Sequence, residues 1–466
     1  VFLVSVMSIL KTHLIDQSLA APELPKPDEH LRILHTSDWH LGKMLYHQSR
    51  YDEFAKFLDW LQDALKIYQV DVLIVAGDIF DTMTPSNRAE HLYHQFLATA
   101  FKNDIKHIII VAGNHDSPTS LHKTKEVLGV LNTHVIGSIS DQIADELITL
   151  SDDAGVPCAI IMAVPYLRDR DVRTSIDATS IDNKNQLLID GMFDHYHCLA
   201  DLAKNQQNHI YKTHQKTIPI IATGHLYAAR AAVSSADDGM RDIQIGTLGQ
   251  ISSEVFDEAI DYAALGHIHA AQIVGKQSRI RYSGSPIAMG FGEIGRHKQV
   301  LIVDLPYDKS PKQSIDQPDL MQFFDGADTS AVRIHSLPVP IFQSLAKISG
   351  DMAFIESSID DLKAHDQPIW LEIEYTGDSL MPNLKQQINA LTKDSQLLAL
   401  SIKNTQTHSG SLRAKSMDIT LDKLNEMQVF KKRLAKENLP DDEQEQLIQA
   451  YQALMKQMQE TDNNAQ

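Results

Sequence analysis

The chain has 466 residues and a formal net charge of −19, from 42 Lys and Arg against 61 Asp and Glu. At about 100 to 200 residues per domain, this length predicts two or three domains. A balance of 43% hydrophobic and 22% charged residues excludes fibrous and wholly disordered proteins. The acidic charge supplies no general basic field for phosphates, so any activity on nucleic acid requires metal ions, a local patch or a partner. The 22 histidines suggest metal ligation.

The N-terminal segment and the cysteines give information about the cellular compartment of the protein. The apolar run at 1–10 is too short to span a bilayer, and it lacks the basic residues that precede the apolar core of a signal peptide. Cys158 and Cys198 form no CxxC pair and no disulfide framework, which is typical of a reducing compartment. We therefore expect a cytoplasmic protein with no membrane association, and we treat residues 1–30 as an N-terminal extension.

Short apolar runs alternate with helical patterns from residue 31 onward. The runs are rich in β-branched residues, as in the buried strands of an α/β sheet, and they lie at 32–34, 70–76, 107–112, 159–164, 218–222 and 262–265. Helical patterns at 51–68 and 88–102 fit between them as crossovers. Five runs are followed by polar segments, at 36–40, 77–78, 113–116, 224–225 and 266–269. Open α/β sheets place their sites at the carboxyl ends of strands, so these side chains should meet.

The composition changes after 299–305. Residues 306–330 are rich in Asp, Ser, Gln and Pro and predict a linker or insertion at the end of a first domain that spans 31–335. Strand and helix patterns then alternate over 336–410, at 341–348, 352–364, 369–375, 380–391 and 397–404. Residues 411–466 carry two helical patterns, separated by Pro440, each with one apolar face. These faces either pack within the chain or, as we predict, dock onto another protein.

The polar segments contain the ligands of a two-metal centre. Two divalent metals about 3.5 to 4 Å apart need one bridging carboxylate with nitrogen and oxygen ligands on each side. The candidate ligands are Asp38, His40, Asp78, Asn114, His225, His267 and His269. Imidazole and carboxylate without thiolate favour manganese, iron or zinc, of which we predict manganese. One Gly-His-x-His is weak evidence, whereas five such pieces in order at strand ends are strong evidence. Glycines 77, 113, 224 and 266 would let the backbone turn sharply before each ligand.

These motifs resemble those of a known superfamily. Asp38-Trp39-His40, Gly77-Asp78, Gly113-Asn114-His115-Asp116, Gly224-His225 and Gly266-His267-Ile268-His269 are similar to the motif series of the calcineurin-like metallophosphoesterases. Within that superfamily, segments 35–42, 221–225 and 282–286 resemble the SbcD family of Mre-type DNA repair nucleases. The resemblance implies a β-sandwich flanked by helices (α/β/β/α), a small α+β capping domain at 336–410 and a C-terminal helix pair at 411–466 that binds a partner.

The same resemblance implies a function. It points to a manganese-dependent exonuclease and hairpin or single-strand endonuclease that acts on double-stranded DNA ends in repair, recombination and replication. The implied partner is an SMC-like ATPase of the SbcC type, with two copies of the nuclease forming a homodimer within a heterotetramer. One metal would take Asp38, His40, Asp78 and His269, and the other Asp78, Asn114, His225 and His267, with Asp78 bridging.

Two further residues are candidates for catalysis. His115 follows the ligand Asn114 but should point elsewhere, because adjacent side chains diverge. The resemblance makes it the residue that protonates or stabilises the leaving oxygen. Asp81 either orients His115 by accepting a hydrogen bond from its other ring nitrogen or caps the turn at 82–85.

Two other functions remain open. The first is a phosphatase or cyclic-nucleotide phosphodiesterase on the same fold. Phosphoprotein phosphatases carry Asp-Arg-Gly after the second motif, whereas Asp81 is followed here by Thr82-Met83. The second is a non-catalytic scaffold, against which the intact ligand set argues.

Overall fold

The computed structural model describes residues 8–16, 22–103, 105–172, 181–228, 251–309, 332–379, 381 and 383–405. The chain divides into two units, Val1–Lys403 and Asn404–Gln466, and the elements below belong to the first unit, except that the last strand ends at Asn404. The predicted C-terminal helices at 411–466 and most of the predicted linker at 306–330 lie outside the described residues.

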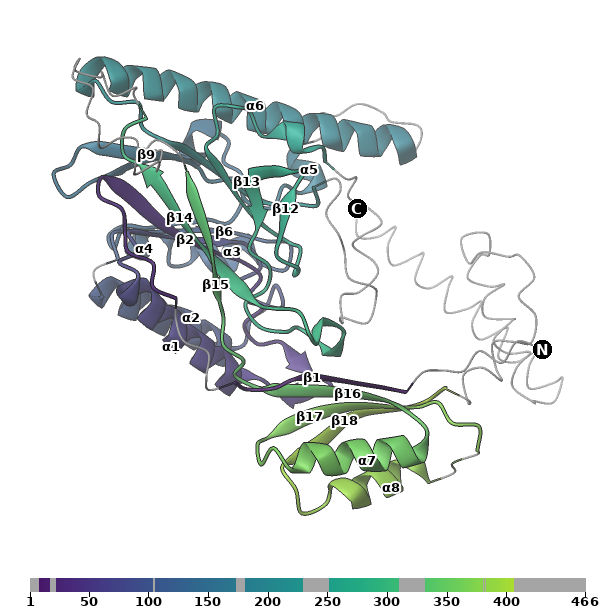
Figure 1. The fold of residues 1–466 in the computed structure, drawn as a ribbon. Helices are drawn as coiled ribbons and strands as arrows, with labels where there is room; N and C mark the ends of the chain where they lie inside the picture. The colour runs from purple at the N-terminus through teal and green to yellow at the C-terminus, as the bar shows by residue number, and fades with distance from the viewer. Residues whose placement is uncertain are drawn as a thin grey trace, which may run out of the picture. The chain divides into compact units, whose positions relative to one another are not determined.

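The first six-stranded sheet has the order β15-β14-β2-β5-β6-β7. Its strands are β2 (His30–Thr36), β5 (Val72–Ala76), β6 (His107–Val111), β7 (Thr133–Ile136), β14 (Gln299–Pro306) and β15 (Arg333–Pro338). The four from β2 to β7 run parallel, and β14 lies antiparallel to both β2 and β15. Helices α1 (Tyr51–Ile67) and α2 (Asn87–Lys102) are the crossovers that cover this sheet (Figure 1). Helix α1 buries Phe54, Phe57 and Leu61 at a spacing of three or four residues, as an amphipathic helix must.

The second six-stranded sheet has the order β12-β13-β11-β10-β9-β8. Its strands are β8 (Leu147–Ser151), β9 (Pro157–Met162), β10 (Ile220–His225), β11 (Tyr262–Gly266), β12 (Gln272–Val274) and β13 (Gln277–Tyr282). The long helix α6 (Ile181–His214) covers its outer face (Figure 1). One apolar cluster joins the two sheets, with Ile74 and Ile109 from the first and Ile161 and Ile221 from the second. The predicted α/β/β/α sandwich is therefore confirmed.

Shorter elements connect the strands. The helices are α3 (Pro118–His122), α4 (Lys125–Gly129) and α5 (Asp169–Val172). Among the described residues, 3₁₀ turns lie at Ile143–Glu146, Ser253–Val255 and Phe291–Glu293, and β3 (Met44–Leu45) pairs with β4 (Gln48–Ser49). No helix in the described part of the chain is long and apolar enough to cross a membrane.

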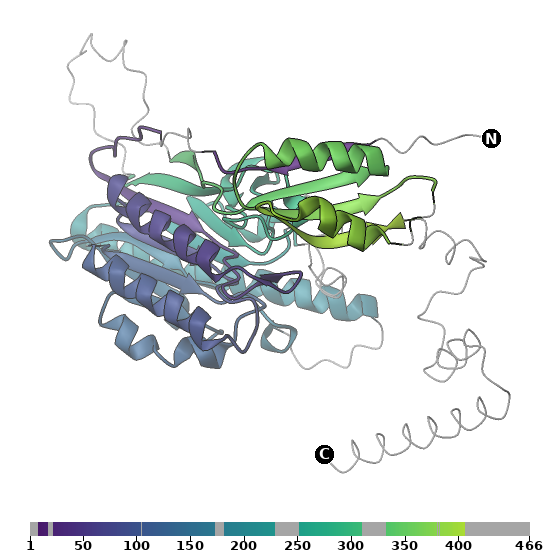
Figure 2. The same ribbon diagram turned by 90° about the horizontal axis from the view of Figure 1, so that it is seen from below.

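A third sheet, of order β1-β16-β17-β18, belongs to the predicted capping domain. Its strands are β1 (Ile9–His13), β16 (Ser344–Gly350), β17 (Ile369–Tyr375) and β18 (Leu397–Asn404). Helices α7 (Met352–Lys363) and α8 (Leu384–Thr392) lie against its strands (Figure 2). Strand β1 comes from the predicted N-terminal extension and runs antiparallel to β16, which the sequence did not predict. Strand β15 crosses the predicted domain boundary at 335 and remains in the first sheet.

Candidate metal centre

The seven candidate ligands come from both sheets of the sandwich. On the first sheet, Asp38 and His40 follow β2, Asp78 follows β5 and Asn114 follows β6. On the second sheet, His225 ends β10, and His267 and His269 follow β11. Six of the seven are buried, and His267 is half-buried. The predicted gathering of these side chains at the carboxyl ends of the strands is what the structure shows.

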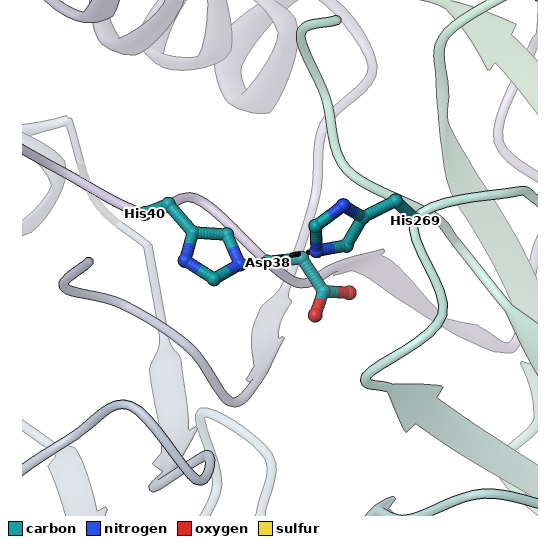
Figure 3. A group of neighbouring side chains, drawn as sticks. All are labelled: Asp38, His40 and His269. Carbon is teal, nitrogen blue, oxygen red and sulfur yellow. Dashed lines mark hydrogen bonds between the residues drawn. The ribbon is translucent and has the colours of Figure 1, made fainter. Parts of the chain in front are cut away.

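One donor group consists of Asp38, His40 and His269, which offer ligand atoms within 4.8 Å of one another. Figure 3 shows the two imidazole rings turned toward each other, with Asp38 between them. The Nε2 atoms of His40 and His269 are 3.1 Å apart. The two imidazoles in this arrangement direct nitrogen atoms at one region, where a cation would accept both lone pairs.

A second donor group lies around Asp78 and His225. The Asn114 Oδ1 atom is 3.0 Å from His225 Nε2 and 3.0 Å from His267 Nδ1. Asp78 Oδ2 is 3.2 Å from His225 Nε2 and 3.6 Å from His40 Nε2. Asp78 thus lies close to a histidine of each donor group, and Asp38 offers a ligand atom to both groups.

The backbone is strained at four of these residues. Asp38, His40, Asp78 and His267 have φ values of 53°, 49°, 51° and 97°, a left-handed conformation that costs energy for non-glycine residues and clusters at functional sites. Hydrogen bonds between the loops hold this conformation. The Asp38 amide donates to Gly77 O at 2.9 Å, and the His40 amide donates to Asp78 O at 3.0 Å.

The glycines before the ligands have two different roles. Gly77 has a φ of 88°, so it turns the backbone as predicted. Gly113 does not have a positive φ, but a Cβ there would lie 2.7 Å from Asp78 Cγ and closer still to the Asp78 amide nitrogen. Gly113 is therefore required for the close approach of two strand ends, and not for a turn.

His115 and Asp81 meet through the backbone. His115 is half-buried, and its Nδ1 is hydrogen-bonded to the main-chain carbonyl of Asp81 at 2.8 Å. Our prediction placed this bond on the carboxylate, whereas Asp81 Oδ1 lies 3.2 Å from Lys43 Nζ and 3.4 Å from His40 Nδ1. The ring of His115 lies edge-on to that of His40, with 4.9 Å between centroids.

The surroundings of His267, His40 and Asp78 favour the deprotonated form of each side chain. Burial lowers the pKa of His267 to about 4, and it lowers the pKa of His40 despite the nearby carboxylates of Asp81 and Asp78. Burial alone would raise the pKa of Asp78, but His225 lowers it well below its ordinary value. The reverse holds for His225, where Asp78 overcomes burial and raises the pKa to about 9. A metal ion that took His225 as a ligand would displace a proton from its ring.

Three polar residues near the ligands were not predicted as site residues. The Asp116 carboxylate accepts hydrogen bonds from the backbone amides of Ile79, Phe80 and Gly113, so it ties the loop after β5 to the loop after β6. Burial, together with Asp78, raises its pKa to about 6. The other two, Glu293 and Lys298, lie beside His269.

Glu293 and Lys298 form a buried ion pair of 2.5 Å. Lys298 Nζ also donates to Ser285 Oγ at 2.7 Å, and Glu293 Oε1 lies 3.4 Å from His269 Nδ1. Burial raises the pKa of Glu293, but Lys298 and His269 lower it more, so it stays below its ordinary value. Asp116 stands within a recognisable motif, whereas no motif pointed to Glu293 or Lys298.

Comparison with known proteins agrees with this geometry. The family model described as calcineurin-like phosphoesterase matches residues 31–271, and the model described as type 5 capsule protein repressor C-terminal domain matches residues 341–438. The SbcD subunit of nuclease SbcCD from Escherichia coli strain K12 is 36% identical over 420 residues, which cover 90% of this chain and 96% of that protein. The chain belongs to the SbcD family of calcineurin-like phosphoesterases.

Other members of the SbcD family match a shorter part of the chain. The SbcD subunit of nuclease SbcCD from Rhodobacter capsulatus is 33% identical over 291 residues, which cover 60% of this chain and 68% of that protein. The Bacillus subtilis protein of the same name is 32% identical over 275 residues, covering 59% and 66%.

The donors of this SbcD-family chain fit divalent metal ions, which the calcineurin-like phosphoesterase fold binds. Imidazole nitrogens and carboxylate oxygens converge in both groups. A donor set of this kind, without thiolate, suits first-row divalent ions. Cys158 and Cys198 are both free and stand outside these groups.

Proposed function

We propose that the protein is the DNA nuclease subunit of an SbcCD-type complex, with two manganese ions per chain. The observation that carries this proposal is the convergence of seven ligand side chains from both sheets beside His115. The names of its relatives, which are SbcD subunits of nuclease SbcCD, support the substrate class and imply a second subunit. We also propose that the protein acts in the cytoplasm, as part of a homodimer within a heterotetramer.

The metal assignment follows the two donor groups. One ion would take Asp38, His40, Asp78 and His269, and the other would take Asp78, Asn114, His225 and His267. When bound, the two ions would neutralise charge on the scissile phosphate and activate the attacking water. The His225 ring is oriented for this role because its Nδ1 lies 2.9 Å from the Ala76 carbonyl oxygen, so its Nε2 faces Asp78.

We propose that His115 donates the proton to the leaving oxygen. The Asp81 carbonyl accepts a hydrogen bond from His115 Nδ1–H in both protonation states of the ring, so the ring keeps one orientation throughout the reaction. Its Nε2 is then the atom that gives up or takes a proton. The His115 amide donates to Asp78 Oδ1 at 2.9 Å, which fixes the distance between the proton donor and the proposed bridging ligand.

The test compares three substrates. The purified chain, with and without its ATPase partner, is given manganese and end-labelled duplex DNA, a DNA hairpin or a simple phosphomonoester. We expect cleavage of duplex ends and hairpins, increased by the partner with ATP, and little turnover of the phosphomonoester. Preference for the phosphomonoester would instead support a phosphatase, and no turnover of any substrate would support a scaffold.

We further propose that residues 411–466 bind the ATPase. The family model that starts in the capping domain continues to residue 438, which supports a shared role for this part of the chain within the family. The two apolar helix faces predicted from the sequence would supply the contact surface.

A further inference from the structure

Two lysine-bound carboxylates flank the first donor group. Asp81 Oδ1 lies 3.4 Å from His40 Nδ1 and 3.2 Å from Lys43 Nζ. Glu293 Oε1 lies 3.4 Å from His269 Nδ1, while Glu293 Oε2 pairs with Lys298 Nζ at 2.5 Å. The same order of lysine, carboxylate and imidazole thus occurs twice, on segments of the chain that are far apart in sequence.

Each imidazole lies between its carboxylate and the other ring. The Nε2 atoms of His40 and His269 face each other at 3.1 Å, so their Nδ1 atoms point away, toward Asp81 and Glu293. A carboxylate that accepts Nδ1–H keeps the proton on that nitrogen, fixes the ring orientation and leaves the Nε2 lone pair for a metal ion.

These nitrogens have no competing partner. Within the described residues, the buried atoms His40 Nδ1, His269 Nδ1 and Glu293 Oε1 make no hydrogen bond. At 3.4 Å the pairs are slightly longer than a normal hydrogen bond, so a small rotation of each ring would complete them. His225 in the second group differs, because its Nδ1 contacts the backbone carbonyl of Ala76.

We propose that Asp81 and Glu293 are positioning residues that orient His40 and His269 for one of the two metal ions. Lys43 and Lys298 hold the two carboxylates in place. The inference rests on the proposed function only in taking His40 and His269 as ligands of the same ion. In this proposal the Asp81 carboxylate orients the His40 ring. The Glu293 carboxylate, which no sequence motif indicated, orients the His269 ring.

The test measures metal binding. Manganese is titrated by calorimetry into the metal-free full chain, as wild type and as Glu293→Gln, Asp81→Asn and Glu146→Gln. Glu146 is the matched control, because it is also a buried carboxylate paired with a histidine, with Oε2 at 2.8 Å from His195 Nε2, and it stands outside both donor groups. We expect Glu293→Gln and Asp81→Asn each to lower the affinity for one of the two ions by about 10-fold or more. The affinity for the other ion should stay near that of wild type in those two variants. In Glu146→Gln the affinities for both ions should stay near wild type.

Thermal unfolding of the metal-free variants separates positioning from stability. If Glu293→Gln and Asp81→Asn bind both ions like wild type, the proposal is wrong, and any loss of melting temperature then shows a purely structural role. Should Glu293→Gln not fold, Asp81→Asn decides, because the Asp81 side chain is 24% exposed. A wild-type chain that binds two ions but cuts no DNA would defeat the proposed function and leave this inference standing. A wild-type chain that binds no ion would overturn both.

Discussion

Gly113→Ala is the smallest change that should disable the centre. The added Cβ would lie 2.7 Å from Asp78 Cγ and closer still to Asp78 Oδ1 and to the Asp78 amide nitrogen. Real Cβ atoms essentially never approach a neighbour within 3.0 Å. Asp78 cannot yield by rotating its side chain alone, because its backbone nitrogen is also in the way. The loop that carries the proposed bridging ligand must therefore move.

The required displacement sets the size of the effect. Relief of these overlaps needs a shift of roughly 1 Å, and a misplacement of about 1 Å in an active site can cost about 100-fold in rate. We therefore expect kcat/KM for duplex DNA to fall about 100-fold, or about 2.7 kcal/mol of transition-state stabilisation. Manganese affinity should fall at both positions, because Asp78 lies close to a histidine of each donor group.

The assay has an internal control. Gly129→Ala, at the end of α4, places a Cβ where no atom lies within 4 Å, so activity should not change and stability should rise by about 0.5 to 1 kcal/mol. Both variants are compared with wild type on end-labelled duplex DNA in manganese with the ATPase present. A Gly113→Ala enzyme within about threefold of wild type would refute the argument from close approach.

Four further predictions follow from the site and the chain. Asp78→Ala should abolish activity and lower metal content at both positions, since both ions lose a carboxylate; elemental analysis that still finds two ions per chain would contradict the assignment. His115→Leu should keep manganese binding near normal while the exonuclease rate falls about 100-fold or more; metal loss in this variant would mean a structural role. A chain truncated after about residue 415 should fold and bind manganese but no longer co-purify with its ATPase partner, and either a retained complex or collapse of the nuclease domain would place the helices in the chain's own core. Burial lowers the pKa of His35 from 6.5 to about 3. Between these two pH values the unfolded state therefore binds a proton that the folded state does not. The free energy of unfolding should fall as pH drops from 6.5 toward 3, by at most about 1.4 kcal/mol per pH unit. In urea titrations His35→Gln should show a shallower pH dependence, and an unchanged slope would disprove this origin.

The strands and ligand positions were predictable because each depends on a short stretch of sequence. The apolar run at 107–112 became β6 (His107–Val111), and the run at 262–265 became β11 (Tyr262–Gly266). A buried strand can be recognised in the sequence by a continuous run of β-branched residues. A parallel sheet then brings the carboxyl ends of its strands together. Residues directly after such runs, such as Asn114, are therefore placed by topology alone.

Contacts between distant segments were not predictable in this way. Glu293 lies in a 3₁₀ turn far along the chain from Asp38 and His40, and its place beside His269 depends on how the turn packs. For Asp81, the spacing from Asp78 indicated proximity to His115 but not which oxygen accepts the bond. A main-chain carbonyl and a carboxylate of one residue are equivalent at the level of sequence spacing.

Strand β1 shows the same limit for a whole element. Its residues are mostly exposed, so neither face carries the apolar pattern that identifies a strand. The extended conformation of β1 is stabilised by pairing with the edge of β16. Ile9 lies opposite Ser349, and His13 lies opposite Leu345. Backbone hydrogen bonding to an available edge requires no particular side chains, and so it leaves little trace in the sequence.

The centre depends on the sandwich as a whole because each proposed ion would take ligands from both sheets. One ion would join Asp38 and His40 of the first sheet to His269 of the second, and the other would join Asn114 to His225. The distance between the ligand loops of the two sheets depends on the apolar interior that the sheets share. There, Ile74 and Ile109 pack in one cluster with residues of the second sheet. Close-packed interiors transmit small volume changes instead of absorbing them. The packing between the two sheets is therefore as much a part of the metal geometry as the ligands themselves.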